Sequence, residues 1–353
     1  MKKVDFLCVM WYVSCRNSCR EKKEVIAMME KVYSPKYEDI IGQFVMTDKP
    51  NSKFDPKEDA FNNLVKDALK KSFPDFNFRT LTETDEGKAD YKEWESVKKA
   101  EKKRLPKGEQ KNFEEPTKTQ YLVNRLEANG FIARYVEYFR NPSVQNQSEA
   151  DFDKWHHETC QLFLDILNGR CNGLGKGIKI YENLCYGKAQ KIVNMMFKHL
   201  YCLVAEKYEE YKDYFTYCHM TLDNFTLEWF QRHTDNTRTK SWSNLIYEDN
   251  PNAISNNSEC YQYYQKIIRD YFKNDNTKEE YGGLTPFQAE FFIWPEIQLH
   301  MATEAFLFAM DTDTYKGRQK EVQQSKKEIL TMPIDKLIFE VEHAIDKYKR
   351  NLL

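Results

Sequence analysis

The 353-residue sequence predicts a mainly α-helical protein built as a multi-helix bundle. Apolar residues recur at intervals of three and four along several stretches, which is the period of an amphipathic helix. Hydrophobic residues make up 41% of the chain and aromatic residues 14%, so a sizeable core is available, while 31% charged residues keep the surface polar. The length predicts one large helical body or two domains that share an interface.

Charge and cysteine content narrow the class of protein. A net charge of −2 provides no global positive field, so a histone-like role is disfavoured and any DNA contact has to come from a local basic surface. Nine cysteines, an odd number without a CxxC pair, indicate reduced core thiols, a cytoplasmic location and no metal site. The apolar run at 4–13 is short for a signal sequence, and no segment reaches the roughly twenty apolar residues of a membrane span, so we expect no membrane contact.

Residues 1–150 are predicted to form a mostly helical N-terminal region. Helical periods run from 21 to 33, from Asp59 to a stop at Ser72-Phe73-Pro74, and from Thr119 to Phe139 with a break at Asn129-Gly130. Each of these stretches ends at a proline or a glycine, which fixes its boundary.

The segment between Thr80 and Pro116 differs from its neighbours. Apolar residues are sparse in it and lysines are frequent, which predicts an exposed helix followed by a loop. The basic run 98–107 can contact a phosphate backbone, but glutamates interleave with it, and a solvated charged face is the alternative.

A polar segment just before residue 150 predicts a boundary. A core is expected at 151–310, beginning with a helix at 152–167, and C-terminal helices at 311–353 are expected to pack on that core. Five of the twelve glycines lie between 169 and 187, which predicts a tight connection. The phosphate-loop pattern GxxxxGK[ST] is missing there, so no cofactor is expected.

An apolar, core-forming helix is predicted after Gly187. Its polar residues Lys191, Asn194 and Lys198 are spaced three, four and seven apart, so they form one row beside which a ligand can meet both amines. A solvated lysine face is the alternative. The start of the helix, at Gly187 and Lys188, presents N–H groups that favour an anion such as a DNA phosphate.

The stretch HMTLDNF supplies His219 and Asp223 just before the next helix, and either Thr221 or Asp223 is a candidate for its N-cap. Trp229, in that helix, is a candidate for stacking against a base. The candidates for holding DNA at the mouth of the site are basic and aromatic residues of the following segment, for which an ordinary surface loop is the alternative. These residues are Arg238, Lys240 and Trp242.

A later helix is predicted to begin at Thr285-Pro286, with Thr285 as its cap. Within it, Glu290 lies among aromatic residues, and we expect an ion pair with a core lysine or arginine, a functional role being the alternative. His300 and Glu304, four residues apart, can bind a metal ion, but no third ligand accompanies them, so no metal is expected.

A glycine turn leading into an apolar helix that carries a lysine, followed by an aspartate at the head of the next helix, resembles the core of the helix-hairpin-helix DNA glycosylases, especially the 8-oxoguanine type. The resemblance covers 162–229. The wider pattern GKAQK, NMMFKHLY, HMTLD and TPFQAEFFIW also resembles a group of bacterial proteins. The resemblance implies that Lys198, with Lys191 in reserve, is the Schiff-base nucleophile and that Asp223 lies beneath the sugar.

The function expected from this resemblance is excision of a modified or damaged base from DNA. A carboxylate stabilises the oxocarbenium charge that develops on the sugar, and an amine attacks C1′. The base has to be flipped into a pocket lined by aromatic side chains. The alternative is a non-enzymatic helical module that binds nucleic acid or protein, including a role in phage–host conflict such as antiphage defence.

Overall fold

The computed structural model describes residues 54–76, 81–170, 177–204, 208–234, 236, 240–254, 257–274, 281, 283–291, 293, 294 and 297. Within these ranges the chain is mainly helical and contains three isolated β-bridges but no β-strand, which confirms the predicted mainly α class. The predicted helix at 21–33, the His300 and Glu304 pair and the C-terminal helices lie outside the described residues. None of the described helices is long and apolar enough to cross a membrane.

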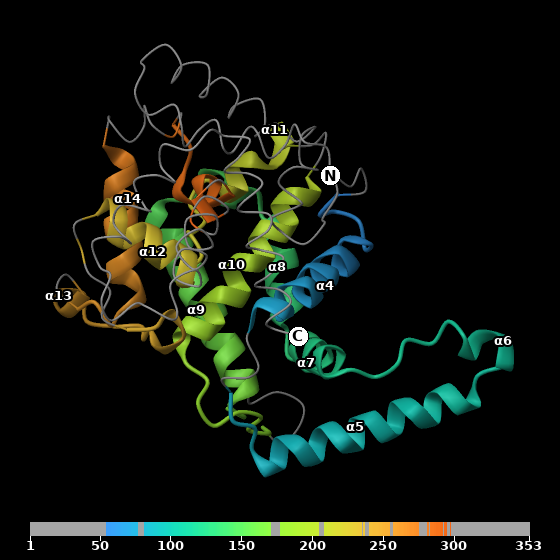
Figure 1. The fold of residues 1–353 in the computed structure, drawn as a ribbon. Helices are drawn as coiled ribbons and strands as arrows, with labels where there is room; N and C mark the ends of the chain where they lie inside the picture. The colour runs from blue at the N-terminus through green and yellow to red at the C-terminus, as the bar shows by residue number, and fades with distance from the viewer. Residues whose placement is uncertain are drawn as a thin grey trace, which may run out of the picture.

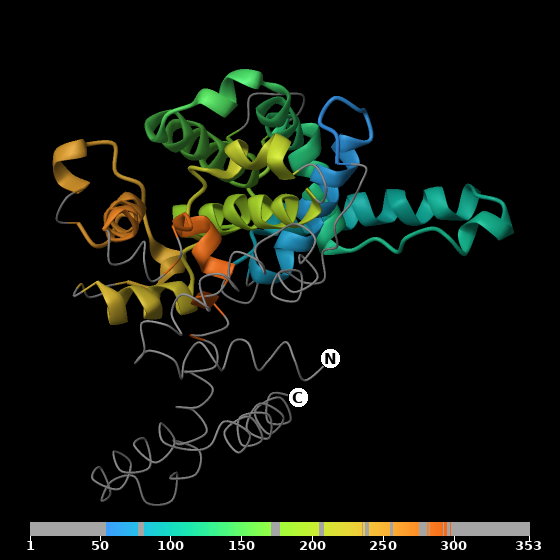
Figure 2. The same cartoon turned by 90° about the horizontal axis from the view of Figure 1, so that it is seen from above.

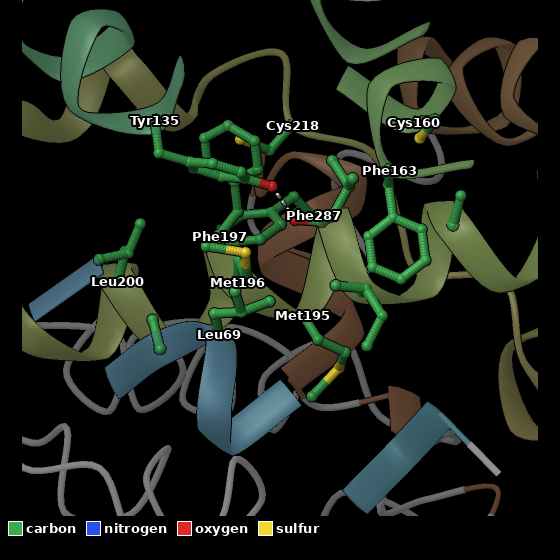
Figure 3. Close-up of a cluster of buried hydrophobic side chains, with 14 of the residues drawn as sticks. Leu69, Tyr135, Cys160, Phe163, Met195, Met196, Phe197, Leu200, Cys218 and Phe287 are labelled. Carbon is green, nitrogen blue, oxygen red and sulfur yellow. Dashed lines mark hydrogen bonds between the residues drawn. The ribbon is translucent and has the colours of Figure 1, made fainter. Parts of the chain in front are cut away.

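Helix α10 (Tyr186–Leu203) is the centre of the fold, because all of its residues are buried. Helices α4 (Phe61–Ser72) and α9 (Glu149–Leu167) pack along it, as Figure 1 shows. In Figure 3 the side chains of Met196 and Phe197 lie between α4 and Tyr135. The Tyr135 hydroxyl donates to the Val193 carbonyl at 3.0 Å, so a polar contact fixes the aromatic packing against the helix.

Helices α7 (Lys118–Ala128) and α8 (Phe131–Arg140) confirm the predicted break at Asn129-Gly130. Gly130 has φ +84°, a left-handed conformation that costs glycine little and other residues more. The preceding helix begins with a capping box between Thr117 and Gln120. The buried faces of α7 and α8 then complete the core around α4 and α9.

The boundary predicted near residue 150 falls where α9 begins at its N-cap, Ser148. Helices from both sides of this boundary contribute to the same hydrophobic core around α10. The later part of the chain adds α12 (Asn224–His233) and α14 (Tyr261–Lys273). The short elements are η2 (Phe73–Phe76), α6 (Lys107–Gln110), η4 (Pro142–Asn146), α11 (Tyr208–Tyr211), η6 (Lys212–Phe215), η7 (Trp242–Asn244) and α13 (Pro251–Ile254).

Helix α5 (Asp85–Arg104) confirms the exposed helix predicted in the lysine-rich segment. It projects from the body and ends in α6, from which the chain returns to α7 (Figures 1 and 2). Gly87 is the one residue of α5 that is buried, and Val97 in its distal half is 52% exposed. We call α5, α6 and the returning segment 111–117 the arm.

Candidate functional site

Two lysine–carboxylate pairs lie along one side of α10. The Lys191 Nζ is 3.3 Å from the Asp223 Oδ2, and the Lys198 Nζ is 2.8 Å from the Glu290 Oε1. Lys191, Asn194 and Lys198 are all buried, with relative exposures of 8%, 1% and 5%, so the alternative of a solvated lysine face is wrong. The structure therefore brings Lys191, rather than Lys198, opposite Asp223.

Asp223 is held in place by donors on both carboxylate oxygens. Its Oδ1 accepts the backbone N–H groups of Phe225 and Thr226 at 2.9 and 3.1 Å, which makes it the N-cap of α12 as the sequence predicts. Its Oδ2 accepts the indole N–H of Trp294 at 3.1 Å as well as the Lys191 amine. Burial raises the pKa of Asp223, but Lys191 and these hydrogen bonds outweigh it and hold the pKa below the ordinary value.

Trp242 covers the Lys191 end of the pair. Its ring centroid is 4.8 Å from the Lys188 Nζ and 4.9 Å from the Lys191 Nζ, distances at which a cation is attracted to the ring face. A Cβ on Gly187 would lie 1.8 Å from the Trp242 carbonyl oxygen, so only glycine allows this approach. Phe225 and Trp294 stand edge to face 4.6 Å apart, and Trp294 adds a second aromatic wall beside Asp223.

The start of α10 does not present free N–H groups to the surface. The Gly187 N–H donates to the Leu245 carbonyl at 3.0 Å, and Lys188 is 2% exposed with its amine 3.0 Å from the Phe76 carbonyl oxygen. Burial lowers the pKa of Lys188 to about 8. The Gly187 N–H and the Lys188 amine, both predicted to contact the DNA backbone, are thus hydrogen-bonded to carbonyl groups inside the protein.

The second pair confirms the ion pair predicted for Glu290. This carboxylate also accepts the Thr221 N–H at 2.8 Å through its Oε2. Burial raises the pKa of Glu290 above its ordinary value, against the opposing effect of Lys198. Thr285 caps this helix as predicted, because its side chain and that of Gln288 exchange hydrogen bonds with each other's backbone N–H groups.

The segment Met220–Leu222, just before Asp223, is held by buried side chains that the sequence reasoning did not single out. The Gln190 amide donates to the Leu222 carbonyl at 2.8 Å and accepts the Leu222 N–H at 3.2 Å. Gln265, on α14, donates to the Met220 carbonyl at 2.7 Å. These contacts fix the backbone of the segment that places Asp223 opposite Lys191. A preorganised site requires supporting contacts of this kind.

His219 and Asn194 belong to a buried hydrogen-bond network. The His219 Nε2 is 2.7 Å from Asp153, and its Nδ1 is 2.8 Å from the Tyr261 hydroxyl, which in turn receives the Asn194 amide at 3.0 Å. Burial lowers the pKa of His219 to about 4, so the ring is neutral near pH 7 and donates from Nε2 to the carboxylate. The Asn194 Oδ1 completes the network with His156 at 2.9 Å.

Asp153 anchors this network at its outer end. Burial raises its pKa, but hydrogen bonds from His219 and from both terminal nitrogens of Arg269, at 2.8 and 2.7 Å, hold the pKa of Asp153 below the ordinary value. A bidentate guanidinium–carboxylate pair fixes orientation as well as charge. The network therefore secures α9, α10 and α14 to one another around the site.

The other predicted substrate contacts are dispersed. Trp229 is fully buried and donates its indole N–H to the Tyr281 hydroxyl at 3.0 Å, so it forms part of the core. Lys240 pairs with Glu259 at 2.6 Å. Trp242 is the member of this group that reaches Lys191, and Arg238 lies outside the described residues.

Among the described residues, no group of three or more histidine, cysteine, aspartate or glutamate side chains is arranged to hold a metal ion. The five cysteines within the described ranges are free thiols, and Cys185 is the one that is not fully buried.

Comparison with protein-family models, with curated proteins and with solved structures found no match to this chain. The functional argument therefore depends on the geometry of the site.

Proposed function

We propose that this protein excises a modified or damaged base from DNA, with Lys191 as the nucleophile and Asp223 as the carboxylate that stabilises positive charge on the sugar. The observation that carries the proposal is the 3.3 Å approach of the Lys191 Nζ to an Asp223 carboxylate that stays ionised. An ionised carboxylate fixed before the reaction stabilises a developing cation without reorganisation.

Exposure favours Lys191 over Lys198 as the reacting amine. The side chains of Lys191 and Asp223 retain 11% and 8% of their exposure, whereas those of Lys198 and Glu290 retain 6% and 1%. Trp242 and Trp294 border the more exposed pair, and aromatic faces of this kind stack against an extruded base. A sugar that reaches this position meets the amine and the carboxylate together.

The proposed reaction is a displacement at C1′. The Lys191 ammonium gives up one proton, which the departing base takes up. The electron pair freed on Nζ forms a bond to C1′ as the bond from C1′ to the base nitrogen breaks, with its electrons leaving on the base. Opening of the sugar ring then transfers an amine proton to O4′ and leaves a protonated imine between Nζ and C1′. Asp223 stabilises the positive charge on the sugar during these steps.

Borohydride trapping tests the proposal. Hydride reduces the imine to a stable secondary amine, so wild-type protein should become covalently attached to duplex DNA that contains an abasic site or 8-oxoguanine. Proteolysis and mass spectrometry should locate the DNA adduct on Lys191. Lys191→Gln should abolish trapping, and Asp223→Asn should slow it by about 100-fold or more, the size of effect seen when one preorganised electrostatic group is removed from an active site.

Lys188→Gln is the matched control, because Lys188 contacts the same Trp242 ring but holds the Phe76 carbonyl. This variant should still trap DNA. An adduct on Lys188 or Lys198, or wild-type protein that binds DNA but never traps or cleaves any modified duplex, would rule out the Lys191 mechanism. In the second case the binding-module alternative remains, and it requires that DNA binding survive Asp223→Asn.

A further inference from the structure

The arm divides into two halves of opposite charge. From Asp85 to Ser96 it carries five acidic and two basic residues, a net charge of −3. From Val97 to Thr117, which includes the returning segment, it carries seven basic and four acidic residues, a net charge of +3, although the whole chain has a net charge of −2. The positive charge is thus concentrated in the half that lies farthest from the body (Figure 2).

The acidic half is the anchored half. Asp90 accepts a hydrogen bond from Tyr121 of α7 and lies 3.7 Å from Arg125 of the same helix. Lys118, at the start of α7, pairs with Glu83, and its amine lies 4.9 Å from the Tyr91 ring centroid. These contacts attach the base of the arm to the rest of the molecule.

The tip has its own internal support. Lys102 pairs with Glu115 of the returning segment, and the Gln110 side chain donates to the Leu105 carbonyl at 2.7 Å. A helix of 20 residues at a rise of about 1.5 Å per residue places this tip about 30 Å from the base. The arm therefore holds its basic end at a defined distance from the body.

Four cations at the tip are exposed and form no ion pair within the part of the chain that the structure describes. They are Lys103, Arg104, Lys107 and Lys111. Cations in the last turn of a helix also complement the helix dipole, which accounts for Lys103 and Arg104 at the end of α5. Lys107 and Lys111 are the first residue and the C-cap of α6, which has only four residues and therefore a small dipole. A concentration of unpaired charge of one sign favours a partner of the opposite sign.

The chemistry of the tip distinguishes among anionic partners. A stable protein interface needs buried aromatic or aliphatic anchors, and an interfacial membrane helix needs an apolar face. The exposed large hydrophobic residues of the described chain are Val97 and Ile246, and only Val97 lies on the arm. Duplex DNA needs neither, because it presents about one negative charge per 1.7 Å of its axis and binds cations by counterion release.

We infer that the tip of the arm is a docking surface for the phosphate backbone of duplex DNA, separate from the candidate site at Lys191. Lys103, Arg104, Lys107 and Lys111 neutralise phosphates, and the anchored acidic half keeps the contact away from the body. This inference goes beyond base excision, because the arm would hold DNA whether or not a base is removed.

The test compares two quadruple variants of the full chain by fluorescence anisotropy with a labelled duplex over a range of salt concentrations. The arm variant carries Lys103→Gln, Arg104→Gln, Lys107→Gln and Lys111→Gln. The control carries Lys57→Gln, Lys92→Gln, Lys154→Gln and Lys266→Gln, which remove the same charge at exposed lysines elsewhere, including one in the acidic half of α5.

Wild-type protein and the control should bind with similar salt dependence. The arm variant should bind more than about tenfold more weakly in moderate salt, and the slope of log Kobs against log salt should fall by about 3 to 4, since each phosphate contact contributes about 0.9. Equal losses in both variants, or full retention of binding by the arm variant, would overturn the inference. The inference would also be overturned if the arm variant lost binding to a labelled acidic polypeptide, measured in the same way, but kept its binding to the duplex.

Measuring both DNA binding and borohydride trapping for the wild type, the arm variant and Lys191→Gln separates the two proposals. Binding that depends on the arm but yields no borohydride adduct in wild-type protein would leave the arm assignment intact and remove the excision chemistry. Trapping that depends on Lys191 while the arm variant binds normally would do the reverse.

Discussion

The two lysines that the structure pairs along α10 are two helical turns apart, yet their carboxylate partners differ. Asp223 receives donors on both oxygens from Lys191, Trp294 and the first turn of α12, and its pKa lies below the ordinary value. Glu290 receives Lys198 and one backbone N–H, and burial raises its pKa. The same helix thus supports one carboxylate that keeps its charge and one for which charge is costly.

This difference separates a candidate reacting pair from a structural pair. A carboxylate that stays ionised near pH 7 can stabilise a cation on a sugar, whereas a deeply buried one that resists ionisation cannot do so as well. Glu290 instead links Lys198 to the Thr221 backbone and so helps to position the segment before Asp223. The structural pair therefore helps to position the candidate reacting pair through the backbone between them.

The largest expected effect is on stability, from the structural pair. Lys198→Met leaves the Glu290 carboxylate buried without its cation and should lower the free energy of unfolding by about 3 to 5 kcal/mol. Lys191→Met should cost less, about 1 to 3 kcal/mol, because Asp223 keeps its other donors. Urea denaturation checks both values. The double variant Lys198→Met/Glu290→Leu should regain most of the loss, and equal losses for the two single variants would contradict the comparison.

The next effect links the two pairs through Gln190. Gln190→Leu leaves the Leu222 N–H and carbonyl buried without their partner, which should cost about 1 to 3 kcal/mol for each group and shift Asp223 away from Lys191. Borohydride trapping should slow at temperatures where the variant is still folded by circular dichroism. Gln265→Leu, which releases only the Met220 carbonyl among the described backbone groups, is the matched control and should slow trapping less.

The smallest effect is the pH dependence of stability, for which the two carboxylates have opposite signs. The pKa of Asp223 is lowered in the folded state, so its contribution is present above the ordinary value of 3.8 and is lost as the pH falls through the folded pKa. The pKa of Glu290 is raised, so stability declines as the pH rises from 4.5 through its folded pKa. Each unit of difference corresponds to about 1.4 kcal/mol.

The free energy of unfolding, measured from acid to neutral pH, should therefore change differently in the variants Asp223→Asn and Glu290→Gln. Asp223→Asn should remove stability at neutral pH and lose less than wild type on acidification. Glu290→Gln should abolish the decline above pH 4.5. Parallel pH profiles for the two variants would show that the carboxylates do not differ as their surroundings indicate.

Local signals predict much of the fold from sequence. Proline and glycine stops give the ends of α4 and α8, and short polar side chains give the caps at Asp223 and Thr285. Glu290, an acid within an aromatic run, predicts a buried ion pair because an unpaired charge there would be too costly. The stops and caps depend on residues that are close together in the chain, and the prediction for Glu290 depends on its aromatic neighbours rather than on the identity of the cation.

The parts that sequence did not predict depend on distant partners. Lys191 and Lys198 have the spacing of a solvated face, and only carboxylates 32 and 92 residues away explain their burial. Gln190 has no distinguishing pattern, because an amide within a helix is ordinary until a loop docks on it. The projection of the arm likewise follows from where α7 holds its base, which the sparse apolar pattern of α5 does not specify.

The support of Met220–Leu222 by Gln190, Gln265 and Glu290 has a consequence for the order in which the molecule assembles. These three side chains come from α10, α14 and the segment that follows Thr285, so the backbone before Asp223 is fully satisfied only after all three have docked. A variant that keeps any one of the three from docking therefore leaves a buried backbone group of this segment without its partner.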